Sequence, residues 1–260
     1  RNFASVPSIA VGVKHGNACG AAVGATMIEA VQKMLQGDTR AIFGGVVMIN
    51  GPIDKEVAET LMHFDMDSEN SRLLDGVIGS SVTDEALELL GRKKLRVVVN
   101  PALAKLGENS LNQKRAVRPV RGGNLEQPNY VFIQDLAAQH MQHYGEATDQ
   151  QKRDMILAWA VGATSNSNTI TLVKYGQLIG NGVGQQDRVG AGQLAISRTT
   201  TDFPSVEETD GKIVVTITLD KQKLSGSTAY SDSFFPFPDG PAILAKAGVK
   251  EGLGLHEADL

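Results

Sequence analysis

The sequence is poor in cysteine, tryptophan and aromatic side chains in general. Its 260 residues include one cysteine, Cys19, and one tryptophan, and aromatic residues make up 5% of the chain. A single cysteine cannot form a disulfide within the chain, and without a cluster of cysteine and histidine it cannot anchor a zinc ion. These shortages exclude a disulfide-stabilised scaffold and a zinc-finger module. We expect a cytoplasmic protein that binds no zinc.

Long apolar runs and a strong charge of one sign are also missing. No stretch approaches eighteen uninterrupted apolar residues, and no basic and then apolar leader is seen, so neither a membrane span nor secretion is expected. The formal net charge is −4, and basic residues are scattered apart from a short run at 91–94. This distribution argues against a nucleic-acid surface. It is compatible with an anionic small molecule, which needs only a few local donors.

Glycine is what the sequence has in quantity. Its 28 glycines cluster at 16–24, 44–51, 122–123 and 176–192, where apolar runs end. Glycine allows sharp turns and a close approach of the backbone to a ligand. These ends are therefore where a binding site is expected.

Apolar segments that suit buried strands alternate with amphipathic segments that suit helices. Strands are expected at 8–13, 41–50, 76–79, 95–100, 130–134 and 212–219, with a strand pair at 169–184. Helices are expected at 21–36, 54–64, 83–94, 149–165 and 240–248. Over residues 8–100 the alternation predicts an α/β half with a largely parallel sheet. The stretch 101–128 reads as an irregular connection. No sequence repeat is evident, yet the halves on either side have similar elements, and we predict two α/β sub-domains, 1–128 and 129–260.

The motif VKHGNACG places Lys14 and His15 side by side where the first strand should end. Ligands of open α/β sheets bind beyond the carboxyl ends of strands, so the position suits a site. Successive strand residues point to opposite faces, and the two bases reach one ligand only if the chain turns here. A histidine so placed can act as a general base near neutral pH. The alternative is a solvated lysine and a capping histidine at a strand–helix junction.

A second glycine-rich stretch, TSNSNTITLVKYGQLIGNGVGQQDR, spans 164–188. Its Asn168 lies between a helix and a strand, where a carboxamide can bond backbone or ligand. Every second residue at the end of the expected strand is a glycine: Gly180, Gly182 and Gly184. One face of the strand therefore carries no side chains there, which leaves room for a ligand or for close packing of another element. No acidic ribose-binding residue follows at the expected distance, so a dinucleotide site is weakly supported.

The stretch SDSFFPFPDG, 231–240, holds three phenylalanines within four residues, between two aspartates. Its prolines disfavour a helix and stiffen an extended segment. The phenylalanine rings of such a segment can stack on a flat heteroaromatic ring of a ligand, while an aspartate carboxylate accepts hydrogen bonds from the N–H groups of that ligand. An ordinary core loop is the alternative. Further arginines at 115, 118 and 121 could clamp a phosphate, or simply face solvent.

These motifs and their order resemble the transformylase domain of the bifunctional purine-biosynthesis enzyme, an AICAR (5-aminoimidazole-4-carboxamide ribonucleotide) formyltransferase. The resemblance is carried by VKHGNACG, AIFGG, LLDGVI, RGGNLEQ, SNSNTI, GQLIGNGVGQQDR and SDSFFPFPDG. It implies two cytidine-deaminase-like α/β sub-domains in three αβα layers, without the deaminase zinc. It also implies a homodimer with composite sites. The implied reaction transfers a formyl group from 10-formyltetrahydrofolate to the 5-amino group of AICAR, giving FAICAR in de novo purine biosynthesis.

The resemblance also implies roles for particular residues. Lys14, His15 and Asn168 match catalytic positions, and Asp75 and Asn17 match positions that contact AICAR. The folate is implied to meet Phe43, Gly44, Phe234, Pro236, Phe237 and Asp239. Arg121 and Arg188 are candidate phosphate donors within this chain. No P-loop for ATP is present, which favours folate as the formyl source, and a monovalent cation stays open because carbonyl ligands leave no residue signature.

The chain departs from the family at both ends and lacks the inosine-monophosphate cyclohydrolase domain. We therefore expect a fragment or a short relative. Ala18 also replaces the usual proline of the KHxNPCG motif. Two alternatives remain: a non-catalytic folate-binding, nucleotide-binding or dimerisation relative, and a deaminase, against which the missing zinc triad argues.

Overall fold

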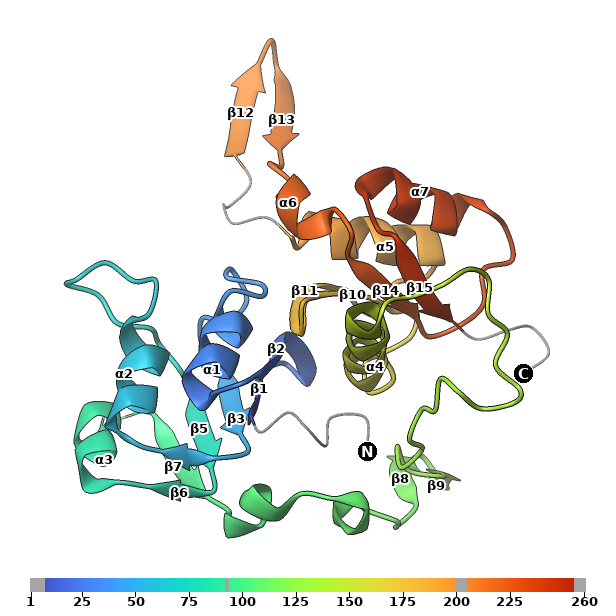
Figure 1. The fold of residues 1–260 in the computed structure, drawn as a ribbon. Helices are drawn as coiled ribbons and strands as arrows, with labels where there is room; N and C mark the ends of the chain where they lie inside the picture. The colour runs from blue at the N-terminus through green and yellow to red at the C-terminus, as the bar shows by residue number, and fades with distance from the viewer. Residues whose placement is uncertain (1–7, 92–93, 200–204, 255–260) are drawn as a thin grey trace.

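The computed structural model describes residues 8–91, 94–199 and 205–254. They form an α/β fold built on one nine-stranded sheet, ordered β15-β14-β10-β11-β2-β1-β3-β5-β7 (Figure 1). The prediction of an α/β fold is confirmed. The expectation of a largely parallel sheet in the first half was wrong, because only two of the four neighbouring strand pairs there are parallel.

The first half of the chain supplies five strands of this sheet and three helices. The strands are β1 (Ser8–Lys14), β2 (Asn17–Gly24), β3 (Val46–Ile49), β5 (Gly76–Gly79) and β7 (Arg96–Val99). The helices are α1 (Met27–Leu35), α2 (Lys55–His63) and α3 (Asp84–Leu90). Side chains of Thr26, Asp54 and Thr83 cap their first turns, as such residues commonly do. The apolar stripe of α1 and α2 packs on the sheet through Met34 and Leu61, both fully buried.

The second half supplies four strands and has helices on both faces of the sheet. The strands are β10 (Ile170–Lys174), β11 (Gln177–Gly182), β14 (Thr228–Ser231) and β15 (Glu251–Gly254). The helices are α4 (Asp149–Gly162), α5 (Arg188–Ser197), α6 (Lys221–Leu224) and α7 (Asp239–Ala247). Helix α4 packs on one face through a core that includes Tyr230, while α5 and α7 pack on the other face around Leu172. Within the described ranges no helix has the length and apolarity that a membrane span needs.

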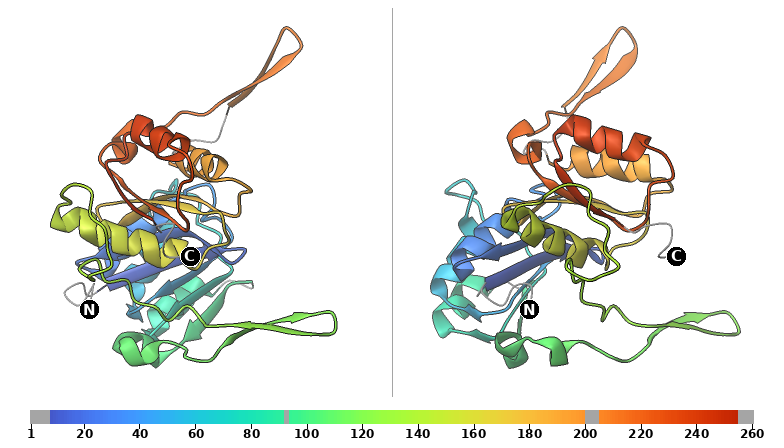
Figure 2. Two further views of the ribbon diagram at one scale, coloured as in Figure 1. Left: turned by 90° about the vertical axis from the view of Figure 1, so that its right-hand side faces the viewer. Right: turned by 45° about the vertical axis from the view of Figure 1, so that its right-hand side comes forward.

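The remaining elements lie at the periphery. They are the short pair β4 (Pro52–Ile53) and β6 (Ser81–Val82), the 3-10 helices η1 (Pro101–Lys105) and η2 (Glu108–Ser110), and two hairpins. The hairpins are β8 (Ala116–Val120) with β9 (Gly123–Gln127), and β12 (Ser205–Thr209) with β13 (Lys212–Thr216). Both project from the body of the molecule (Figure 2).

Four local predictions differ from the structure. Of the expected strand 41–50, residues 46–49 form β3. Residues 21–24, expected to begin a helix, belong to the strand β2, because they are small and buried between two neighbouring strands. Helix α1 begins only after the Thr26 cap. The segment 130–134 adopts no regular structure, and the connection 101–128 contains the β8–β9 hairpin.

The two halves begin with the same short unit, VKHGN at 13–17 and VKYGQ at 173–177. In both, the two central residues have positive φ, with 53° at His15 and 51° at Tyr175, each followed by glycine. Such a turn suits the twist of a β-hairpin. In both halves the third strand then pairs antiparallel with the first, and the next strand pairs parallel with the third. The expectation of no sequence repeat was wrong for this unit.

The alternating glycines of β11 serve packing against α5. A Cβ built on Gly182 would lie 2.0 Å from the carbonyl oxygen of Ala191, and one on Gly180 would lie 2.2 Å from that of Ala195. Real Cβ atoms do not approach oxygen so closely. The sequence left open whether these glycines make room for a ligand or for close packing. At Gly180 and Gly182 they allow close packing against α5.

We predict that Gly182→Ala lowers the free energy of unfolding by about 3 kcal/mol, the upper part of the usual range for core overpacking. Urea unfolding followed by circular dichroism measures it. Gly123→Ala is the matched control, because Gly123 also lies in a strand but has no atom within 4 Å of a built Cβ. Equal stability of the two variants would contradict the close fit of α5 on β11.

Candidate active site

Most of the residues predicted to be functional lie along one edge of the sheet. In the first half, β1 ends there at Lys14, and β3 and β5 begin there, because Val13 pairs with Val46 and Val46 with Gly76. In the second half, β10 begins there and β11 and β14 end there, since Ile170 pairs with both Gly182 and Ser231. The strands β2 and β11 run antiparallel. This pairing puts both sets of strand ends at the same edge.

The first-half residues form one cluster around the side chain of Lys14. Its Nζ donates to the carbonyl oxygen of Phe43 at 2.6 Å, and a Cβ on Gly44 would lie 4.0 Å from that Nζ. The Gly44 N–H donates to Leu73 O, and the Asp75 N–H donates to Gly45 O, both at 2.8 Å. The structure therefore brings Lys14, Phe43, Gly44 and Asp75 together.

His15 stands at the tip of the β1–β2 turn with its side chain exposed. The chain reverses here into a strand, so the alternative of a strand–helix junction is wrong. Asn17 closes the turn, and its Nδ2 donates to His15 O at 3.3 Å. Its Oδ1 is buried and has no hydrogen-bond partner among the described residues. Buried polar atoms are normally paired, so this acceptor is suited to a donor from a ligand.

Asn168 is held at the start of β10 by three hydrogen bonds with Gln185. The Asn168 N–H and its Nδ2 both donate to Gln185 O at 3.0 Å, and the Gln185 N–H donates back to Asn168 O at 3.2 Å. One further N–H of the carboxamide is left to meet a ligand. Asp232 anchors the next residue, since its Oδ1 accepts from the N–H of Thr169 at 3.0 Å. Asn168 is thereby fixed in place.

The aromatic stretch after β14 lies beside this second cluster. The Arg188 guanidinium carbon is 5.6 Å from the centre of the Phe234 ring, a cation–π contact, and Arg188 Nε is buried without a partner among the described residues. Phe237 is 67% exposed. Pro236 and Asp239 are also exposed, and Asp239 is the first residue of α7.

Within one chain, Arg121 does not lie near the other predicted site residues, and Lys14 does not lie near Asn168. Arg121 lies in the turn of the β8–β9 hairpin, which projects away from the sheet (Figure 2). Lys14 and Asn168 share the edge but stand three strand spacings apart, on β1 and β10. At about 4.8 Å per spacing this is roughly 14 Å.

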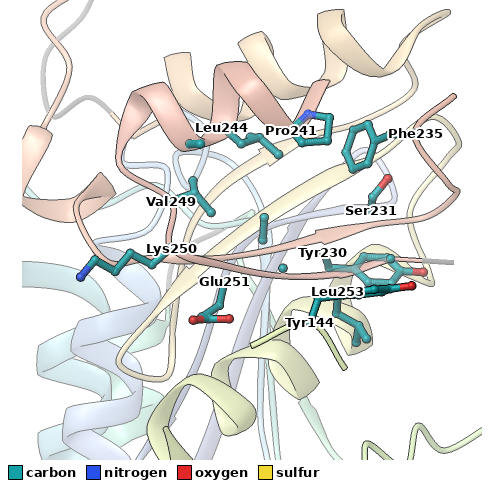
Figure 3. Close-up of a pocket in the computed structure, with 14 residues that line it drawn as sticks. Tyr144, Tyr230, Ser231, Phe235, Pro241, Leu244, Val249, Lys250, Glu251 and Leu253 are labelled. Carbon is teal, nitrogen blue, oxygen red and sulfur yellow. The ribbon is translucent and has the colours of Figure 1, made fainter. Parts of the chain in front are cut away.

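Two cavities lie elsewhere, around the strand β15. One cavity of about 470 Å³ lies between α7 and β14–β15, with Leu244 and Phe235 above and Tyr230 below (Figure 3). An adjoining cavity of about 630 Å³ is lined by residues that include Met141 and Lys152. No residue predicted to be catalytic lines either cavity. The described part of the chain has no group of three or more His, Cys, Asp or Glu side chains suited to a metal ion.

Cys19 is close to the site but is not a nucleophile. Its Sγ donates to Gly12 O, and the side chain is buried. Burial, with a smaller contribution from Asp38, raises the pKa of the thiol from 9.0 to about 11. The thiol is therefore neutral at physiological pH, and covalent catalysis through it is disfavoured.

Sequence reasoning did not single out two positioning residues, Gln185 and Asp232. Gln185 acts through its backbone, which leaves no side-chain signal. Asp232 was noted only as one end of the aromatic stretch. Its contact with Thr169 spans 63 residues of sequence. No local sequence pattern indicates this contact, which follows from the antiparallel pairing of β10 and β14 in the structure.

The chain matches one protein family and a set of curated relatives. The family model described as "AICARFT/IMPCHase bienzyme" matches residues 1–198. The chain is similar to the bifunctional purine biosynthesis protein PurH of Staphylococcus carnosus, with 34% identity over 241 residues, 93% of this chain and 42% of the relative. It is also 31% identical to PurH of Ruegeria pomeroyi over 243 residues, 93% of this chain and 41% of the relative. The chain thus spans about two fifths of the length of these curated relatives.

We predict that native Cys19 reacts slowly with iodoacetamide near neutral pH. The rise in thiol pKa from 9.0 to about 11 lowers the thiolate fraction about 100-fold. Mass spectrometry of the native and the urea-unfolded chain compares the two rates. Rapid, complete labelling of the native chain would contradict the burial of this thiol.

Proposed function

Since the chain belongs to the AICARFT/IMPCHase bienzyme family, we propose that it transfers a formyl group from 10-formyltetrahydrofolate to the 5-amino group of AICAR. The observation that carries the proposal is the placement of the Lys14–His15 turn and of Asn168 at one edge of the sheet. These are the residue types that acyl transfer to a weak amine needs.

His15 acts as the general base in this proposal. The 5-amine of AICAR is a poor nucleophile because its lone pair delocalises into the imidazole and carboxamide. As its nitrogen attacks the formyl carbon, a proton must leave, and an exposed imidazole at the turn tip can accept it. The new N–C bond forms while the bond between that carbon and the folate nitrogen breaks, and Lys14 returns a proton to that nitrogen.

Asn168 stabilises the charge that develops on the formyl oxygen. Its free carboxamide N–H can donate to that oxygen, and its bonds to Gln185 hold it ready. Preorganised donors of this type commonly contribute a large share of acyl-transfer catalysis. No covalent intermediate with the chain is required.

The two substrates are assigned to neighbouring parts of the edge. We assign AICAR to Asn17, Asp75 and Arg188, where the unpartnered Asn17 Oδ1 and Arg188 Nε offer an acceptor and a donor. The folate, which supplies the formyl group when bound, is assigned to the Phe43–Gly44 loop and to the wall after β14. That wall fits a pterin because Phe234, Pro236 and Phe237 present rings next to the exposed carboxylate of Asp239. No resident metal is part of this proposal.

Composite sites in a homodimer complete the proposal. The roughly 14 Å between Lys14 and Asn168 is too far for both to act on one carbonyl. A second copy can bring the missing residues to each site. Arg121, in the turn of the β8–β9 hairpin, can then bind the phosphate of a substrate that is held by a neighbouring copy. Each half, 1–128 and 129–260, is proposed as a cytidine-deaminase-like sub-domain, which the shared strand order supports.

We predict that the chain catalyses formyl transfer and that His15→Ala lowers kcat by at least about 100-fold, the usual loss for a general base. Absorbance assays with AICAR and 10-formyltetrahydrofolate measure it. Tyr175→Ala is the matched control, because Tyr175 has the same turn conformation at the opposite sheet edge, and its activity should stay near that of the parent.

Equal losses in the two variants would show that only the turn geometry matters. Absence of turnover in the parent chain, with folate binding retained, would instead favour a non-catalytic binding relative. Absence of both would contradict the proposed activity.

A further inference from the structure

A half-buried polar side chain, Asn181, joins the two halves of the chain beside the candidate active site. It lies in β11 between Gly180 and Gly182, two residues whose Cβ positions point toward α5. Successive residues of a strand point to opposite faces, so Asn181 points to the face of the sheet on which α4 packs. The core on that face is apolar, and a carboxamide is costly there unless it is hydrogen-bonded.

The carboxamide of Asn181 makes three hydrogen bonds. Thr171, fully buried on the neighbouring strand β10, donates through its Oγ1 to Asn181 Oδ1 at 2.9 Å. Asn181 Nδ2 donates to Ala18 O at 3.1 Å and to Ser165 Oγ at 3.4 Å. A backbone carbonyl oxygen can only accept, so Ala18 O requires the amide nitrogen to face it. This requirement fixes which way the carboxamide points.

Both acceptors lie next to segments that carry residues of the candidate active site. Ala18 is the third residue after His15 and pairs with β1 at the base of the turn. Ser165 is the third residue before Asn168. One carboxamide therefore contacts both the strand that follows the proposed general base and the loop that leads to the proposed oxyanion donor.

This contact does not belong to the backbone frame that the two halves share. Ala21 occupies the place of Asn181 in the first half, since each lies five residues after the glycine of its turn. Ala21 has no polar side-chain group and is fully buried in the core on the α4 face. The carboxamide is therefore not needed to build the repeated unit, and it lies in the half where its strand runs toward the candidate active site.

We propose that Asn181 is a positioning residue for formyl transfer, an inference that rests on the proposed function. It acts through two neighbouring segments rather than on a substrate. Its Nδ2 holds Ala18 O and Ser165 Oγ, and thereby keeps His15 and Asn168 in the arrangement in which each can act. Loss of this donor loosens both segments, and small misplacements of reacting groups lower rates strongly.

Asn181→Asp tests the donor alone, because the carboxylate keeps the shape of the side chain and the acceptor for Thr171 but has no N–H. We expect kcat for formyl transfer to fall at least about tenfold, with the KM values of AICAR and 10-formyltetrahydrofolate changed less than about twofold. Asn112→Asp is the matched control. Oδ1 of this exposed residue accepts from the Lys114 N–H at 3.1 Å, and a carboxylate preserves that bond, so kcat should stay near that of the parent.

A double-mutant cycle separates positioning from a general loss of structure. If Asn181 acts by placing His15 and Asn168, the loss of kcat caused by Asn181→Asp should be smaller in the His15→Ala and Asn168→Ala backgrounds than in the parent. An undiminished loss in both backgrounds would overturn the proposal. So would an Asn181→Asp variant with the kcat of the parent.

Hydrogen exchange followed by mass spectrometry measures the contact without relying on turnover. In Asn181→Asp the backbone amides of 13–18 and 164–168 should exchange several-fold faster, while those of α2 stay unchanged and show that the fold is retained. This result in a chain that lacks formyl transfer would support the coupling of the two segments and place the failure with the proposed function. Unchanged exchange in both segments would overturn the inference, whether or not the chain is active.

Discussion

The antiparallel pairing of β2 with β11 is the constraint on which the rest of the architecture depends. It joins two sets of strands into one sheet, with Ala22 opposite Gln177. Hydrogen bonds on either side reinforce it: the Val23 N–H donates to Gly176 O at 2.8 Å, and Asn181 Nδ2 donates to Ala18 O at 3.1 Å. Had the two strands run parallel, the end of β1 and the start of β10 would lie at opposite edges. Lys14 and Asn168 share an edge only because of this pairing.

The internal repeat duplicates the backbone at the two edges of the sheet but not the side chains. The frame of hydrogen bonds around the Lys14 turn recurs around the Lys174 turn, where the Gly226 N–H donates to Gly248 O and the Lys250 N–H donates to Ser227 O. In that frame Tyr175 occupies the place of His15 and Lys250 that of Asp75. A tyrosine does not accept protons near neutral pH, and a lysine cannot replace a carboxylate acceptor. The backbone is duplicated, but the reactive side chains are not.

Local patterns were sufficient for elements whose burial is one-sided. The helix 54–64 was predicted with its Asp54 cap. The strand 76–79 was also predicted with its bounds, although it is buried on both faces. Residues 17–24 were misread because a strand buried on both faces has no period of two, and its alanines and glycines are also compatible with a helix. The functional residues were recognisable from motifs. Their assembly was not, since the contact of Thr169 with Asp232 and the β2–β11 pairing have no local signal.

A buried charge cluster makes the shared edge rigid as well as continuous. Asp38, 7% exposed, follows α1 and forms an ion pair with Arg198 at the end of α5, at 3.3 Å. Arg40 beside it donates to Ser197 O at 3.0 Å. Sliding one half past the other would break the Asp38–Arg198 pair, while Asp38 would keep its pair with Arg40 of its own half at 3.7 Å. The pair with Arg198 therefore favours one register of the two halves. His15 on one half and Asn168 on the other are thus held in a relative position that the β2–β11 pairing and this ion pair define.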